Sequence, residues 1–179
     1  MQSNPLLLAL GIAVVGAALA AAVPADAASR RVVHPNAEGG VTATSAQAGS
    51  GPNGGAGARG RAVVTDGQGN AAAVSGGALR GPNGSMAGRA GATTVNADGS
   101  AAHRSGFAAQ GANGSAQSNG TATRAADGSV TQGRTTNATS SATGNSATST
   151  SSYSTAAGRA RTTACFDASG ATIACPTRP

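Results

Sequence analysis

The chain has 179 residues, 28 of them Gly, with no Trp, one Tyr and two Phe, and its formal net charge is +6. Burying a large apolar side chain stabilises a fold by roughly 1.5–3 kcal/mol, whereas ordering one residue's backbone costs about 1–2 kcal/mol, so a conventional globular core is excluded. Two descriptions remain: a disordered chain, or a chain that folds through backbone hydrogen bonds and close sheet packing, helped by self-association.

A run of apolar or small residues spans positions 6–23 and is followed by Pro24 and the small-x-small sequence Ala25-Asp26-Ala27. This pattern is typical of a secretory signal peptide over residues 1–27, cleaved after Ala27. The alternative is an uncleaved membrane anchor, because a run of this length is near the lower limit for spanning a bilayer. Cleavage predicts a chain without membrane contact that is secreted, held at the cell surface or kept in the periplasm. Every basic residue is Arg, which together with abundant Ala and Gly is typical of a high-GC bacterium.

Three blocks of 30 residues follow a short segment at 28–50, which carries a degenerate first copy at Asn36. The blocks span 51–80, 81–110 and 111–140, and they begin with GPNG, GPNG and GANG. Each block contains a second, related turn, so the underlying unit is about 15 residues long. An extended unit of that length would reach roughly 50 Å, so it must fold back as a hairpin or wrap as a solenoid coil.

The predicted turns are Asn-Gly and Asp-Gly pairs, namely Asn53-Gly54, Asp66-Gly67, Asn83-Gly84, Asp98-Gly99, Asn113-Gly114 and Asp127-Gly128. Both residues of such a pair tolerate positive φ, which favours type I′ turns. Val and Thr, which favour β-strands, occur between the turns, where the strands are predicted. The predicted fold class is mainly β: short strands and turns stacked as hairpins or as a β-solenoid, in the monomer or only on self-assembly. The alternative is a flexible, disordered spacer whose repeats arose by slippage.

Four arginines follow the turns at a nearly constant offset: Arg59, Arg89, Arg104 and Arg134. On stacked repeats this offset predicts an arginine ladder on one face. Such a ladder would contact anionic polymers, such as acidic polysaccharide, lipopolysaccharide or extracellular DNA, without sequence-specific recognition of nucleic acid. The alternative is that Arg only keeps the chain soluble.

The C-terminal part divides into a Ser/Thr-rich linker or decayed repeat at 141–162 and a segment at 163–179 that holds both cysteines. Cys165 and Cys175 are predicted to form a disulfide across a hairpin, because a turn signal at 167–170 separates them. A redox or metal-binding pair is the alternative, but the spacing is not C-x-x-C and no further ligands accompany it.

Catalytic chemistry finds little support in the sequence. A catalytic site needs ionisable groups that converge, yet after cleavage the chain has only His34, His103 and five scattered carboxylates. We therefore predict no catalytic residues, no metal site, no cofactor and no enzymatic activity.

The leader, the scarcity of large apolar residues and the strand-turn repeats with Asn/Gly turns across residues 36–146 resemble bacterial curli-type functional-amyloid subunits and related secreted surface repeat proteins. The resemblance implies nucleated self-assembly into cross-β fibres at the cell surface. We therefore expect an exported structural protein of the cell surface or matrix. A disordered cationic coat or spacer is the main alternative. An ice-binding β-solenoid is a minor one, since the Thr-x-Thr pairs at 42/44, 121/123 and 148/150 do not follow the repeat.

Overall fold

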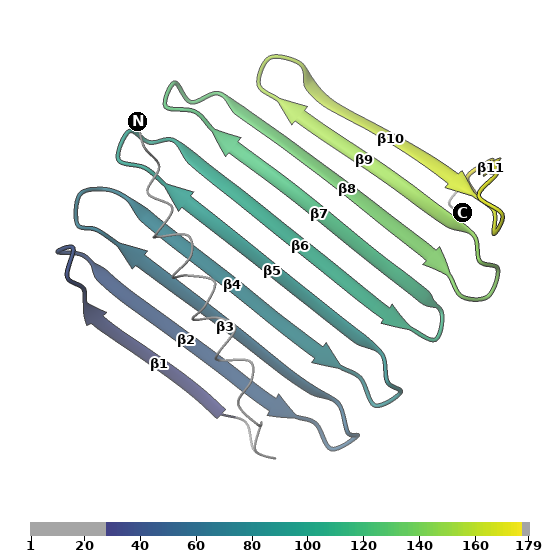
Figure 1. Ribbon diagram of the computed structural model, residues 1–179, viewed down its shortest axis with the longest axis horizontal. Helices are drawn as coiled ribbons and strands as arrows, with labels where there is room; N and C mark the ends of the chain where they lie inside the picture. Colours follow the sequence, from purple (N-terminus) through teal and green to yellow (C-terminus); the bar gives the residue numbers. More distant parts are fainter. Residues whose placement is uncertain (1–27, 177–179) are drawn as a thin grey trace.

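The computed structural model describes residues 28–176, and the predicted signal peptide lies outside this range. The described chain is all-β: eleven strands form one open sheet in which each strand pairs antiparallel with the next in sequence (Figure 1). The strands are β1 (Ala28–Pro35), β2 (Val41–Ser50), β3 (Ala56–Thr65), β4 (Ala71–Arg80), β5 (Met86–Val95), β6 (Ala101–Gly111), β7 (Gly114–Arg124), β8 (Val130–Ser140), β9 (Ser146–Ser154), β10 (Gly158–Phe166) and β11 (Thr172–Ile173).

The mainly β fold class is therefore confirmed, and the repeat unit is one strand plus one turn. Successive strands are hydrogen-bonded neighbours in a meander, so the β-solenoid alternative is wrong for this chain. The Ser/Thr-rich stretch at 141–162 continues the same sheet as β9 and the first half of β10.

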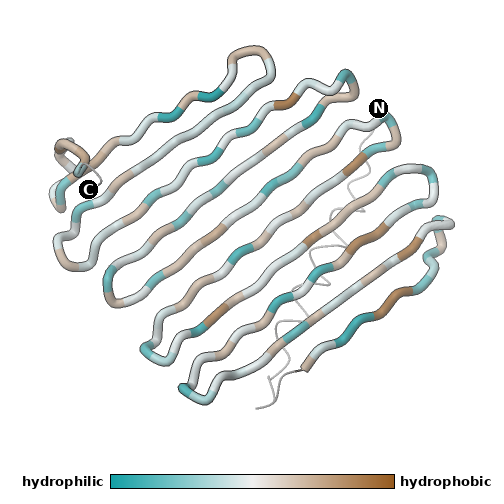
Figure 2. The backbone as a smooth tube through the Cα atoms, turned by 180° about the vertical axis from the view of Figure 1, so that it is seen from behind, coloured by the Kyte–Doolittle hydropathy of each residue, from teal (hydrophilic) through white to brown (hydrophobic). Residues whose placement is uncertain are grey.

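The sheet is a single layer. Among the described residues the buried apolar positions are Ala62 and Cys165, each 6% exposed, while larger side chains such as Leu79 are 65% exposed. Figure 2 shows the hydrophobic positions as short, separated stretches of the tube. Stability within one copy thus rests on backbone ladders and small-residue contacts across neighbouring strands.

Most turns share one geometry. In the loop at 81–85, Gly81 N donates to Ser85 O (2.8 Å) and Gly84 N donates to Gly81 O (3.1 Å), and Gly84 has φ of 74°. The same pair of hydrogen bonds and the same positive-φ glycine occur in the loops at 36–40, 51–55, 96–100, 125–129 and 167–171. This arrangement is a type I turn followed by a glycine bulge.

The expected type I′ geometry is wrong, because positive φ is confined to glycine among the described residues. All six predicted turn glycines do have positive φ: Gly54, Gly67, Gly84, Gly99, Gly114 and Gly128. The Asn or Asp before each glycine keeps negative φ, which costs a non-glycine residue less strain.

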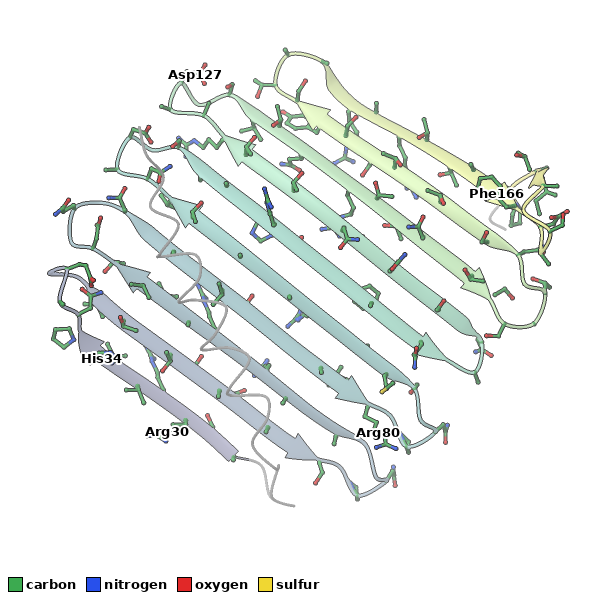
Figure 3. The ribbon with its side chains drawn as sticks, in the orientation of Figure 1. Arg30, His34, Arg80, Asp127 and Phe166 are labelled. Carbon is green, nitrogen blue, oxygen red and sulfur yellow. A yellow bond between two sulfur atoms is a disulfide. The ribbon has the colours of Figure 1, made fainter. Side chains whose placement is uncertain are left out.

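The alternation of Asn and Asp along the sequence separates the two ends of the sheet. Loops that follow even-numbered strands contain Asn53, Asn83 and Asn113, whereas loops that follow odd-numbered strands contain Asp66, Asp98 and Asp127. Antiparallel strands place these two sets at opposite ends, as Figure 3 shows for Asp127 and for Arg80, which precedes the Asn83 loop.

The predicted disulfide is present. Cys165 and Cys175 are bonded, with a Cα–Cα distance of 5.2 Å. Cys165 is paired in register with Ile173 on β11, so the bond joins diagonal neighbours and fastens the short last strand to β10. A disulfide is typical of an oxidising, extracytoplasmic compartment. Within residues 28–176, no helix has the length and apolar character needed to cross a bilayer.

Candidate functional site

The chemically distinctive feature of the sheet is that its faces differ. Residues paired in register project to the same side, and the side alternates along each strand. Following the registers, eight of the eleven described arginines project from one side, which we call the arginine face: Arg31, Arg59, Arg61, Arg89, Arg124, Arg134, Arg159 and Arg161. Arg30, Arg80 and Arg104 project from the other side.

The expectation that the four phased arginines share one face is wrong for Arg104. Arg89 is paired with Phe107, and Arg104 lies three residues from Phe107, so Arg104 projects to the opposite side. An equal offset from the turn did not preserve the face, because the repeat of about 15 residues is odd. Across each five-residue loop the paired flanking residues are six positions apart, so odd-numbered residues project from the arginine face in β1–β6 and Arg104, with an even number, projects from the other side. Arg134 returns to the arginine face because the two-residue loop between β6 and β7 reverses that parity.

Acidic residues are absent from the strands of the described chain. The five described carboxylates all lie in loops: Glu38, Asp66, Asp98, Asp127 and Asp167. The arginine face therefore carries eight positive charges without a carboxylate among them. Screening by salt weakens their mutual repulsion, but the face remains a surface of strongly positive potential.

Several arginines on this face are oriented by neighbouring polar side chains. Arg134 donates from Nη1 to Ser118 Oγ (2.9 Å) and from Nη2 to Ser105 Oγ (3.2 Å). Arg59 Nε donates to Gln47 Oε1 at 2.7 Å, and Arg161 Nε donates to Ser149 Oγ at 3.1 Å. These hydrogen bonds use part of each guanidinium and leave its remaining donors for an anionic ligand.

The opposite side of β3–β6 is built almost entirely from small residues, and we call it the alanine face: Ala56, Ala58, Gly60, Ala62, Val64, Ala72, Val74, Gly76, Ala78, Gly88, Ala90, Ala92, Thr94, Ala102, Gly106 and Ala108. Arg80, Met86 and Gln110 lie at one end of it, and Arg104 interrupts β6. Short side chains allow another layer to approach the backbone closely.

On β7–β9 the same side of the sheet carries mainly Ser, Thr, Asn and Gln side chains. The Thr-x-Thr pairs at 121/123 and 148/150 both belong to this hydroxyl-rich part, and Thr123 Oγ1 lies 2.6 Å from Thr131 Oγ1. The third pair, at 42/44, is on β2, several strands away. The pairs therefore do not form one continuous threonine array.

The loop carboxylates stabilise their own turns. The pKa of Asp98 is lowered by the hydroxyl hydrogen bond from Ser100 and then by the Ser100 backbone N–H. The pKa of Asp127 is lowered chiefly by the backbone N–H of Ser129. Both carboxylates thus accept hydrogen bonds as Asx turns do, which accounts for Asp at these positions.

The two histidines lie apart. His103 on β6 has Nδ1 2.8 Å from Thr93 Oγ1 on the arginine face, whereas His34 is on the outermost strand β1 and projects from the other side. Within the described chain, no group of three or more His, Cys, Asp or Glu residues gathers in a way that could hold a metal ion.

Sequence reasoning missed Arg61, although the signal was present. Arg59 and Arg61 are two residues apart, so the period-two alternation of a strand that contains both puts them on one face. The faces of Arg31, Arg124, Arg159 and Arg161 could not be assigned, because the loop lengths that set the face of each strand were not predicted. No family model, curated protein or solved structure matches this chain.

Proposed function

We propose that this chain is an exported, non-enzymatic structural protein of the cell surface or extracellular matrix, and that copies associate through the alanine face. The observation that carries the proposal is the single-layer sheet without a covering layer in the described chain. A sheet with an apolar face requires a second layer to bury that face.

A second copy fits the alanine face in size and chemistry. Four strands of about ten residues cover roughly 19 Å by 34 Å, or about 650 Å² per copy, which approaches a standard interface of about 800 Å² per partner. The Ala and Gly side chains are short enough for two sheets to pack closely without large cavities. Two copies related by a two-fold axis would present the same surface to each other.

The arginine face is a poor alternative for stacking. Two arginine faces in contact would bring eight positive charges of each copy together without carboxylates to balance them. The alanine face has Arg104 as its one charge within the central area, and Arg80 lies at its margin. Stacking through the alanine face leaves both arginine faces in solvent.

The sheet edges restrain sideways growth. β1 carries Arg30, Arg31 and Pro35, and β10 carries Arg159 and Arg161 along an edge that β11 covers only at Cys165 and Phe166. Pairing β1 of one copy with β10 of another would place these arginines near each other. Repulsion between their positive charges opposes such edge-to-edge pairing. Higher salt screens this repulsion, so we expect elongation into the cross-β fibres implied by the curli-type resemblance to accelerate with ionic strength.

The association test compares one substitution on the two faces. Ala90 and Ser75 are exposed, central strand positions on the alanine face and the arginine face, respectively. Ala90→Lys should abolish concentration-dependent association in analytical ultracentrifugation, because it places a charge between the stacked sheets. Ser75→Lys should leave association unchanged. A monomeric wild-type protein at high concentration, or equal association of both variants, would contradict the proposal.

The proposal gives neither histidine a catalytic role. His34→Gln, on the side of the sheet opposite the arginine face, should therefore leave a cellular phenotype of the protein intact when the amount of exported protein is unchanged. Loss of the phenotype at normal protein levels would argue for chemistry at that histidine.

A further inference from the structure

One cross-strand row on the arginine face has unusual composition. From β3 to β8, the residues paired in register are Arg61, Ser75, Gly91, Ser105, Gly120 and Arg134. An arginine stands at each end, and the four strands between contribute only Ser and Gly. The row therefore forms a low track that runs across the strands.

On the two central strands, β5 and β6, the side chains on both sides of this track are larger. Thr93 and His103 flank it on one side, and Arg89 and Phe107 flank it on the other. A hollow of about 700 Å³ includes Arg59, Arg61, Arg89, Phe107 and His103 in its lining. A second hollow of about 530 Å³ continues from it past Arg134 to Tyr153 and Arg161, and both hollows share His103, Ser105 and Arg134. Together they make one open groove, which we call the cross-strand groove.

The charges along the cross-strand groove are widely spaced. Arg59 and Arg89 lie in one register row with Gly77 between them, and Arg134 and Arg161 are likewise separated by Ser151. Each pair is two strands apart, or roughly 9.6 Å along the row. Between the charged positions, Ser75 and Ser105 offer hydroxyl groups, which donate and accept hydrogen bonds.

We infer that the cross-strand groove binds a linear acidic polysaccharide, extended across the strands, through its carboxylate or sulfate groups. A polysaccharide that carries one anion on every second sugar matches the arginine spacing, and its hydroxyl groups match the Ser-lined floor. A nucleic-acid strand fits less well, because its phosphates repeat every 3.4 Å or so along the helix axis. Phe107 and Tyr153 also lie too far apart, on β6 and β9, to provide the succession of stacking platforms that single strands use.

The inference does not rest on self-association, because the groove and the alanine face lie on opposite sides of the sheet. Binding should therefore be retained by the Ala90→Lys variant described above. If Ala90→Lys still self-associates like the wild type and also binds the polysaccharide, the stacking proposal fails and the groove proposal stands. If the wild type self-associates, and Ala90→Lys is monomeric and does not bind the polysaccharide, the groove proposal fails and the stacking proposal stands.

The test measures binding of the full exported chain to hyaluronate, which carries one carboxylate per two sugars, with chondroitin sulfate, neutral dextran and oligothymidylate as comparison probes. Chondroitin sulfate keeps the carboxylate of each disaccharide and adds a sulfate, so its comparison with hyaluronate shows whether sulfate strengthens binding beyond the carboxylate alone. Arg61→Gln/Arg134→Gln should weaken binding about tenfold, the effect expected from two exposed ion pairs. Arg30→Gln/Arg80→Gln removes the same charge from the other side and should leave the affinity within twofold.

A second variant tests the floor of the groove without changing charge. A Cβ on Gly91 would lie 3.5 Å from Arg104 O, an ordinary contact, so Gly91→Val should fold yet obstruct the track. We expect weaker hyaluronate binding with an unchanged circular dichroism spectrum. Four results would each overturn the inference. The first two are an equal loss of hyaluronate affinity in both double-arginine variants and binding of dextran as tight as that of hyaluronate. The others are tighter binding of oligothymidylate than of hyaluronate and unchanged hyaluronate binding by Gly91→Val.

Discussion

Arg134 on β8 donates a 2.9 Å hydrogen bond to Oγ of Ser118 on β7, one of the few side chains in the described sheet that is only 6% exposed. The same hydroxyl lies 2.9 Å from Thr136 Oγ1. Ser118 on β7 thereby joins two side chains of β8, Arg134 and Thr136, and fixes the direction of a guanidinium that borders the cross-strand groove.

Replacing Ser118 with Ala should lower the free energy of unfolding by about 1 kcal/mol, because Arg134 and Thr136 both lose a partner at a buried position. Ser115→Ala is the matched control, since Ser115 is exposed on the same strand and projects from the other side. Urea denaturation of both variants measures the difference. Equal stability of the two would show that this hydrogen-bond group does not stabilise the sheet.

Gly54→Ala should destabilise the turn between β2 and β3 by about 1–2 kcal/mol, because Gly54 has φ of 78° and an L-residue is strained there. No atom lies within 4 Å of a Cβ at this position, so the cost is conformational and not a clash. Gly51→Ala in the same loop is the control, since its Cβ would meet nothing closer than Gly55 O at 3.9 Å. Thermal or urea unfolding that failed to separate the variants would exclude positive φ as a requirement of the turn.

Acidification should destabilise the sheet at its aspartate end. Hydrogen bonds from Ser100 and Ser129 lower the pKa values of Asp98 and Asp127 below the ordinary value of about 3.9. A carboxylate with a lowered pKa in the folded state contributes stability above its unfolded pKa, and that contribution is lost as pH falls through the folded pKa. The free energy of unfolding should therefore decline below about pH 4.

Asp98→Asn and Asp127→Asn test this origin, because Asn keeps an acceptor oxygen for the turn and does not titrate. The double variant should show a shallower decline of stability between neutral and acidic pH than the wild type. If the free energy of unfolding of the double variant depends on pH as that of the wild type does, the acid sensitivity arises from groups other than Asp98 and Asp127.

Loss of the Cys165–Cys175 bond should loosen the C-terminal edge. The bond closes a loop with a sequence separation of 10 residues, and constraints of that size contribute roughly 2–3 kcal/mol in the loop-entropy account. The Cys165→Ser/Cys175→Ser variant should exchange the amide protons of β11 faster, while β4 and β5 remain protected. Mass spectrometry of protein recovered outside the cytoplasm should show a gain of two hydrogens on reduction, and free thiols in that protein would contradict the bond.

Export should remove residues 1–27. N-terminal sequencing of protein recovered outside the cytoplasm should begin at Ala28, as the Ala25-Asp26-Ala27 site predicts. Recovery of intact chain in the inner membrane alone would instead identify an anchored protein.

The local features of this fold were accessible from the sequence. Asn-Gly and Asp-Gly pairs predicted the turn positions because a positive-φ glycine is a requirement of the turn itself, and Cys165 and Cys175 predicted their bond because a short hairpin joins them. The face to which each side chain projects was not accessible. It depends on whether a loop shifts the strand register by an odd or even number of residues, and one residue of shift exchanges the faces. The short loop between β6 and β7 places Arg134 on the same side as Arg89, whereas Arg104 precedes that loop and projects from the other side. Only the tertiary structure therefore brought Arg61, Gly91, Gly120 and Arg134 into one row.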